Sequence, residues 1–140
     1  MYTAEEARNV AAFEHYHSAG NAGDLEVFGK AVDEAFAPDF LFHTPLPMGT
    51  TGHQALKQVW ETLLRAYPDL HVEVQDVLAD GDKIVARNTV TGTHRGEIHG
   101  IAPTGRKVSY DEIFILRFAD GLITEIWGVV DVLAQLRQLG

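Results

Sequence analysis

The chain has 140 residues, of which 46% are hydrophobic and 22% charged, so we expect one globular domain spanning 1–140. The 20 acidic residues against 11 basic ones give a formal charge of −9, which disfavours nucleic acid and anionic membrane surfaces as partners. The absence of cysteine excludes disulfides, thiolate catalysis and thiolate metal sites.

The first residues, Met1 to Glu6, are acidic where a secretory signal needs positive charge followed by an apolar run. No stretch of the sequence approaches the ~20 apolar residues that a membrane-spanning helix needs. We therefore expect a cytoplasmic protein with no membrane partner.

Two helices are expected at the start of the chain. Thr3 and Glu6 stand in capping-box register before an apolar pattern of helical spacing, which Gly20 ends. Asp24 is placed to cap a second helix, and Pro38 stops it.

A short strand, 40–43, comes next and leads into a loop rich in proline and glycine. The apolar pattern that follows has helical spacing and is closed by Pro68, which predicts a third helix. A last helix is expected over 131–139, where Asp131 is better explained as its N-cap than as a catalytic group.

From Leu70 onward, apolar residues recur at every second position, which is typical of strands. Turn signals such as Asp80-Gly81 separate four runs, and the short connections predict antiparallel neighbours. Glycines inside the second run indicate bulges or bends that curl the sheet. The expected strands are 70–78, 83–101, 107–118 and 122–130.

Helices followed by a strand meander predict an α+β fold, in which a curved antiparallel sheet packs against three N-terminal helices and ends in a short C-terminal helix. A bent sheet closed by helices leaves space between the two layers. We therefore expect a pocket for a hydrophobic small molecule.

The segment 96–106 reads GEIHGIAPTGR and is similar to a hairpin of the SnoaL-like polyketide cyclases and ester cyclases. Segments 67–71, 81–85 and 117–123 match the same family in the same order, so the resemblance covers essentially the whole chain. It implies the cone-shaped, nuclear transport factor 2-like fold, and a homodimer formed through the outer face of the sheet. The side chains that would suit this dimer face are Ile113, Ile115, Ile123 and Trp127. It also implies a cofactor-independent aldol reaction that closes a polyketide ring.

The family's catalytic residues are replaced in this chain. The working histidine of the cyclases aligns with Phe114, and their working aspartate aligns with Gly128. The aspartate and arginine of the related epoxide hydrolases fall near Val90 and Asn88.

Strand alternation places two polar side chains, Asn88 and Glu112, on the expected cavity wall, where Glu112 shares a face with Tyr110 and Phe114. A carboxyl group in an apolar enclosure has a raised pKa, which suits a general acid or base near neutral pH. We predict that Glu112 is catalytic. The alternative is a structural ion pair with a neighbouring cation such as Arg117.

His43 follows the apolar strand at a place where a histidine recurs in the family, so it is the second predicted catalytic residue. It could shuttle a proton or bind a substrate oxygen, a role for which Tyr110 is the other candidate. The structural alternative for His43 is a hydrogen bond to loop carbonyls. The side chains expected to bind substrate are Asn88, Val90, His94, Tyr110, Phe114, Trp60 and Gly128.

The 7 histidines do not have the spacing of a metal-ligand set, and no phosphate-binding glycine loop or nucleophile elbow is present. No metal and no cofactor are therefore expected. Two functions remain open. One is an enzyme that moves protons on a polyketide-like molecule, by aldol cyclisation, isomerisation or hydration and hydrolysis. The other is a non-catalytic dimer that binds such a molecule, which Phe114 and Gly128 would suit.

Overall fold

The computed structural model describes residues 1–43 and 52–140, so most of the loop predicted after His43 lies outside the described residues. Helices and strands follow one another along this part in the order expected from the sequence. The elements are α1 (Ala4–Gly20), α2 (Leu25–Ala35), β1 (Phe36–His43), α3 (Gly52–Ala66), β2 (His71–Asp80), β3 (Lys83–Thr93), β4 (Lys107–Ala119), β5 (Leu122–Val130) and α4 (Val132–Leu139).

Three helices begin at the predicted caps. The Thr3 hydroxyl accepts a hydrogen bond from the Glu6 N–H at 3.1 Å, and the Glu6 carboxylate accepts one from the Thr3 N–H at 2.8 Å. Asp24 accepts hydrogen bonds from the first turn of α2, and Asp131 accepts one from the Ala134 N–H at 3.0 Å. The cap predicted at Asp131 is therefore confirmed. None of the helices described has the length and apolar character needed to cross a bilayer.

The sheet has five strands in the order β1-β5-β4-β3-β2. Strands β2 to β5 are antiparallel neighbours as predicted, whereas β1 pairs with β5 in parallel. The α+β fold with a curved sheet and three leading helices is confirmed, but the sheet is mixed rather than purely antiparallel. Because β1 and β5 are far apart in the sequence, no short connection indicated how they would pair.

The predicted strand 83–101 is too long. Strand β3 ends at Thr93, whose N–H and hydroxyl both donate to the Asp69 carboxylate at 2.7 Å. Beyond it, Ile98 and Ile101 form only an isolated bridge. The β3–β4 pairing has no register shift, and the irregularities that bend strands lie in the other pairings of the sheet.

The segment 94–106 leaves the sheet and docks on the end of α3. The N–H groups of Arg95 and Gly96 both donate to the Ala66 carbonyl, at 2.8 and 3.2 Å. A Cβ atom at Gly96 would collide with the backbone carbonyl of Arg65, so only glycine allows this close approach.

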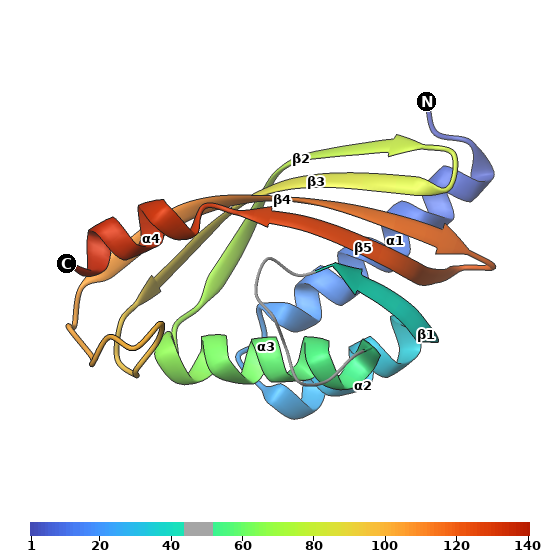
Figure 1. The fold of residues 1–140 in the computed structure, drawn as a ribbon. Coiled ribbons are helices and arrows are strands. Elements are labelled where there is room, and N and C mark those ends of the chain that lie inside the picture. Colours follow the sequence, from blue (N-terminus) through green and yellow to red (C-terminus); the bar gives the residue numbers. More distant parts are fainter. Residues whose placement is uncertain (44–51) are drawn as a thin grey trace.

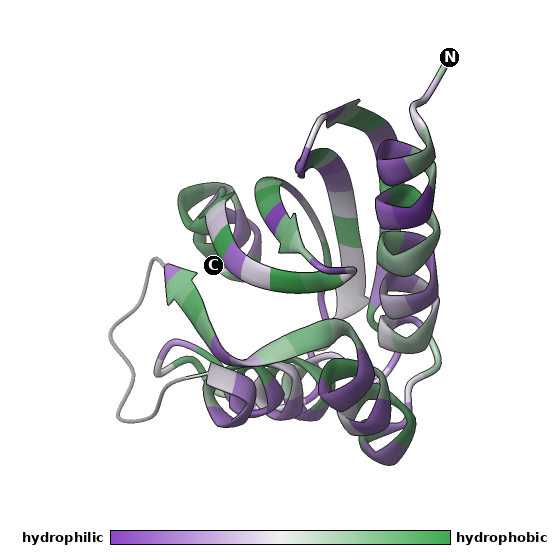
Figure 2. Ribbon diagram, turned by 90° about the vertical axis from the view of Figure 1, so that its right-hand side faces the viewer, coloured by the Kyte–Doolittle hydropathy of each residue, from purple (hydrophilic) through white to green (hydrophobic). Residues whose placement is uncertain are grey.

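Figure 1 shows the curved sheet above α2 and α3, with α4 at one end of the sheet. Hydrophobic and hydrophilic residues alternate along the strands in Figure 2, as expected for a sheet with one face toward a core. The core consists of two buried clusters. The first includes Phe28, Val32 and Phe36, and the second includes Tyr67 and Val90.

Candidate functional site

A cavity of about 340 Å³ lies between the two core clusters. Its wall includes Phe13 and Leu116 from the first cluster, and Val72 and Tyr110 from the second. Close-packed interiors contain few voids larger than a water molecule, whereas small-molecule sites measure about 300–1,000 Å³. The cavity therefore has the volume of a small-molecule site.

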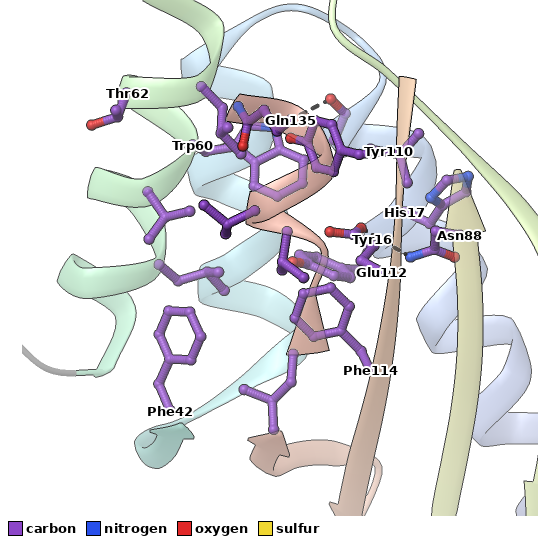
Figure 3. Close-up of a pocket in the computed structure, with 18 of the residues that line it drawn as sticks. Tyr16, His17, Phe42, Trp60, Thr62, Asn88, Tyr110, Glu112, Phe114 and Gln135 are labelled. Atoms are coloured by element: carbon purple, nitrogen blue, oxygen red, sulfur yellow. Dashed lines mark hydrogen bonds between the residues drawn. The ribbon is translucent and has the colours of Figure 1, made fainter. Parts of the chain in front are cut away.

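Alternate residues of β4 face this cavity, namely Tyr110, Glu112, Phe114 and Leu116. The alternation holds because β3 and β4 pair without a register shift along their whole contact. In Figure 3, Tyr110 lies toward one end of the cavity with Gln135, and Phe114 lies toward the other end, with Glu112 between them.

Glu112 and Asn88 are directly paired across β3 and β4, and Asn88 Nδ2 donates to Glu112 Oε1 at 3.2 Å. Burial raises the pKa of Glu112 from 4.5 to about 7, while the hydrogen bond from Asn88 lowers it. No ion pair involves Glu112 within residues 1–43 and 52–140, and Arg117 binds Glu125 instead. A carboxyl group in this state can both give and take a proton near neutral pH.

Two tyrosines lie near this carboxyl group. Burial, followed by the negative charge of Glu112, raises the pKa of both Tyr16 and Tyr110, and both side chains line the cavity. Both hydroxyl groups therefore keep their protons and can donate hydrogen bonds. Sequence reasoning missed Tyr16, although its position three residues after Phe13 places both side chains on the same side of the helix.

His17 is a further cavity-lining residue on α1, and its ring stacks on Phe13. Burial, with a smaller effect of the nearby His71, lowers the pKa of His17. The imidazole is therefore neutral at pH 7 and adds no positive charge to the cavity.

A second polar group of the cavity lies where α4, the segment 94–106 and the end of α3 meet. Gln135 Nε2 donates to the Tyr67 hydroxyl at 2.6 Å, and Gln135 Oε1 lies 3.3 Å from His99 Nε2. Gln135 and His99 both line the cavity. No local pattern predicted this group, because its members come from three distant segments.

His43 is not brought together with Glu112. Phe42 lines the cavity, so the next residue of the strand points to the opposite face of the sheet. There His43 Nε2 lies 2.7 Å from Glu125 Oε2, and the ring stacks on Trp127.

Val90 and His94 do not line the cavity either. Val90 is 2% exposed and packs inside the second core cluster. His94 lies just after β3 ends, is fully buried, and binds the Thr104 hydroxyl through Nδ1 at 2.9 Å. Because it binds Thr104 within the same segment, His94 is a structural histidine that stabilises the segment 94–106.

Trp60 and Phe114 line the cavity as expected. The Trp60 indole N–H donates to the Gly20 carbonyl at 3.2 Å, so its polar atom is already bound. Gly128, which was predicted to bind substrate, does not line the cavity. It pairs with Phe114 across β4 and β5, and a Cβ atom there would collide with the Phe114 ring. The ring thus fills the place where a side chain at position 128 would stand.

Metal-binding groups do not converge in the described residues: nowhere in 1–43 or 52–140 do three or more histidine or acidic side chains come close enough to hold a metal ion.

The sequence profile of the SnoaL-like polyketide cyclases matches residues 10–139. The chain belongs to this family. The membership agrees with the resemblance carried by the segment 96–106, which is thereby confirmed.

Two curated cyclases of the family are similar to the chain. Nogalonic acid methyl ester cyclase of Streptomyces nogalater is 32% identical over 114 residues, which cover 78% of this chain and 83% of that cyclase. Aklanonic acid methyl ester cyclase DnrD of Streptomyces peucetius is 32% identical over 125 residues, covering 89% and 83%. Among solved structures, TsrD from Streptomyces laurentii has a TM-score of 0.84 and 31% identity, with 96% of each chain covered.

Proposed function

We propose that this family member is a cofactor-independent cyclase that acts on a hydrophobic, polyketide-like molecule, with Glu112 as its acid–base group. One observation carries the proposal: a carboxyl group with a pKa near 7 lines an otherwise largely apolar cavity. Such a group is uncommon outside functional sites, because burying an acid without a cation is costly.

The chemistry would be an intramolecular aldol addition. The Glu112 carboxylate takes a proton from a carbon next to a carbonyl group, and the resulting enolate carbon attacks a second carbonyl of the same molecule. A carbon–carbon bond forms, and the new alkoxide takes the proton back from Glu112. The substrate and product are isomers, so no oxidant or other co-reactant is needed.

The tyrosine hydroxyls would bind the enolate oxygen. Tyr110 stands two positions from Glu112 on the same face of β4, and Tyr16 also lies close enough to sense the charge of Glu112. Because both hydroxyls remain protonated, either can donate a hydrogen bond to an oxyanion, which is the usual stabilisation in such reactions. Tyr110 takes this role in preference to His43, which lies on the other face of the sheet.

The names of the two cyclases guide the choice of probes. Purified protein is incubated with nogalonic acid methyl ester and with aklanonic acid methyl ester, and a product of unchanged mass is sought by chromatography and mass spectrometry. Glu112→Gln is expected to lower turnover by about 10²–10⁴-fold, the usual contribution of a general acid or base. Its melting temperature should not be lowered, because the amide removes the cost of burying a charge.

The matched control is Asp111→Asn. Asp111 is the neighbouring acid on the same strand, exposed on the opposite face, and its carboxylate accepts a hydrogen bond from the Thr89 hydroxyl. This variant is expected to keep turnover within about twofold, since exposed substitutions have small effects. Unchanged turnover in Glu112→Gln would remove the proposed mechanism.

A non-catalytic binding protein is the second candidate, and the pairing of Phe114 with Gly128 favours it. These positions align with the working histidine and aspartate of the cyclases, and here they hold an aromatic ring and a glycine. A pH profile distinguishes the two candidates. Turnover that depends on pH with a midpoint near pH 7 supports catalysis. If no product of unchanged mass forms, and binding does not change from pH 5 to 8, the protein only binds the molecule.

We also propose a homodimer that uses the outer face of the sheet. Ile113, Ile115 and Val129 are 46%, 36% and 75% exposed on that face. Ile123, which was predicted to lie on this surface, is fully buried and does not belong to it. Sedimentation equilibrium tests the proposal, and Ile113→Glu is expected to shift a dimer toward the monomer.

A further inference from the structure

We propose that His99, held by Gln135 and Tyr67, is an anchor for a hydroxyl group of the substrate. The inference rests on the proposed function and adds to it the kind of substrate and its orientation: an amphipathic molecule whose hydroxyl-bearing end lies at α4 and whose apolar end lies beside Phe114.

The first support is a series of hydrogen bonds that runs from the core, through Tyr67 and Gln135, to His99 on the cavity wall. Tyr67 is fully buried, and Gln135 is 2% exposed. The amide of Gln135 is fixed at both ends, since its Nε2 donates to the Tyr67 hydroxyl and its Oε1 lies 3.3 Å from His99 Nε2. His99 is itself exposed, so this end of the cavity reaches the protein surface.

The hydrogen bond with Gln135 determines which ring nitrogen of His99 donates and which one accepts. An amide oxygen can only accept a hydrogen bond, so the proton of a neutral His99 ring lies on Nε2. Nδ1 is then an acceptor, and no hydrogen bond to it is made by any residue in the part of the chain that the structure describes. An available acceptor selects a hydrogen-bond donor, and in a neutral polyketide-like molecule that donor is a hydroxyl group.

The backbone supports the same reading. His99 and Gly100 have φ values of 52° and 76°, and they form the two-residue turn between Ile98 and Ile101. Positive φ at both central residues is normal for a tight hairpin turn, and histidine is among the non-glycine residues that adopt it most readily. Such a tight turn keeps the imidazole at one place on the cavity wall.

The lining of β4 gives the direction in which a bound molecule would lie. Tyr110, Glu112, Phe114 and Leu116 follow one another on the same face, with about 7 Å between alternate residues. Gln135, the partner of His99, lies toward the Tyr110 end, and Phe42 lies with Phe114 at the other end (Figure 3). A molecule with its hydroxyl group on His99 and its apolar end beside Phe114 would therefore present its middle to Glu112.

The test uses three probes that differ at one position: methyl 6-hydroxy-2-naphthoate, its 6-methoxy analogue and methyl 2-naphthoate. Their dissociation constants are measured by fluorescence titration. The original protein is expected to bind the hydroxy probe about fivefold more tightly than either analogue, which is the size of one net hydrogen bond. Equal affinity for the hydroxy and methoxy probes would overturn the proposal, because a methoxy group cannot donate.

Two variants test the residues. His99→Gly removes the acceptor and suits the positive φ of the turn, so it is expected to fold and to lose the preference for the hydroxy probe. Gln135→Leu leaves His99 in place but removes its partner, and is expected to reduce the preference to about twofold or less. Gln135 is thus a positioning residue, and its readout is the ratio of two affinities, which a general loosening of the cavity would leave unchanged.

Gln138→Leu is the matched control on the same helix. Gln138 binds the backbone of Ser109 and does not line the cavity, so this variant loosens α4 without touching the anchor. It is expected to keep the fivefold preference. A preference that survives in His99→Gly, or that is lost equally in Gln138→Leu, would overturn the anchor.

The binding test is independent of catalysis. A clear hydroxyl preference combined with failure of the Glu112→Gln turnover test would leave the anchor standing and remove the proposed chemistry. A Glu112-dependent turnover without any hydroxyl preference would remove the anchor alone.

Discussion

Two glutamates on opposite faces of one sheet behave in opposite ways. Glu112 faces the cavity from β4, where burial raises its pKa to about 7. Glu125 lies on the outer face of β5, where hydrogen bonds from Arg117 and His43, at 2.6 and 2.7 Å, lower its pKa. The same side chain thus keeps its proton in one place and releases it in the other. The partners available on each face, and not the residue type, therefore decide the protonation of the carboxyl group.

The largest stability difference between the two faces should appear in the pH dependence of unfolding. Between pH 4.5 and about 7, the folded state holds a proton on Glu112 that the unfolded state has released. The free energy of unfolding therefore falls as the pH rises through this window, and the fall is on the order of 2–3 kcal/mol. Glu112→Gln removes this fall, which urea unfolding of both proteins at pH 5 and pH 8 would measure.

Glu125→Gln is the control on the outer face. Because the pKa of Glu125 is lowered, its contribution to stability is present above its ordinary pKa and is lost only as the pH falls through the folded value. The variant should therefore show the original pH dependence between pH 5 and 8. If both variants lost the pH dependence, or if both kept it, the two carboxyl groups would not differ in the way described.

The next largest effect on stability is expected from a substitution of Gly128, on the cavity-facing side of the sheet. Gly128→Ala places a methyl group against the Phe114 ring, and overpacking of this kind typically costs about 1–3 kcal/mol of unfolding free energy. The loss should shrink when Phe114→Leu is introduced first, because the ring is then gone. Denaturant unfolding of the single and double variants measures it, and simple additivity of the two losses would argue that the residues are not coupled.

The smallest effect concerns the hydrogen bond between Asn88 and Glu112. Asn88→Leu removes a contact that lowers the pKa of Glu112, so the midpoint of the pH dependence of turnover should move to higher pH. Thr89→Val is the matched change on the outer face, since Thr89 binds Asp111 there, and it should leave the midpoint in place. Carboxyl carbon chemical shifts of Glu112 would follow the same titration without a substrate.

Much of the cavity wall could be predicted from strand alternation alone. Asn88, Tyr110, Glu112 and Phe114 all line the cavity, because β3 and β4 pair without a register shift and the period of two is never broken. The capped helices and the family membership were equally accessible. These features depend on residues close together in the sequence, or on motifs that cover the whole chain.

The parts that could not be predicted depend on contacts between distant segments. The face to which His43 points is set by the parallel pairing of β1 with β5, and no local signal specified that pairing. His94 left the cavity wall because β3 ends at Thr93 rather than continuing. Gln135 and His99 meet only through the docking of α4 and the segment 94–106.

The close contact between Gly96 and the carbonyl of Arg65 has a wider consequence. It fixes the segment 94–106, which connects β3 to β4, on the end of α3, so the place of the loop that carries His99 depends on a contact outside the strand that carries Glu112. Exchanging this loop as a unit, with Gly96 retained, would change which group is recognised at the exposed end of the cavity and leave Glu112 in place. Evolution, or an engineer, can therefore vary selectivity and reactivity one at a time.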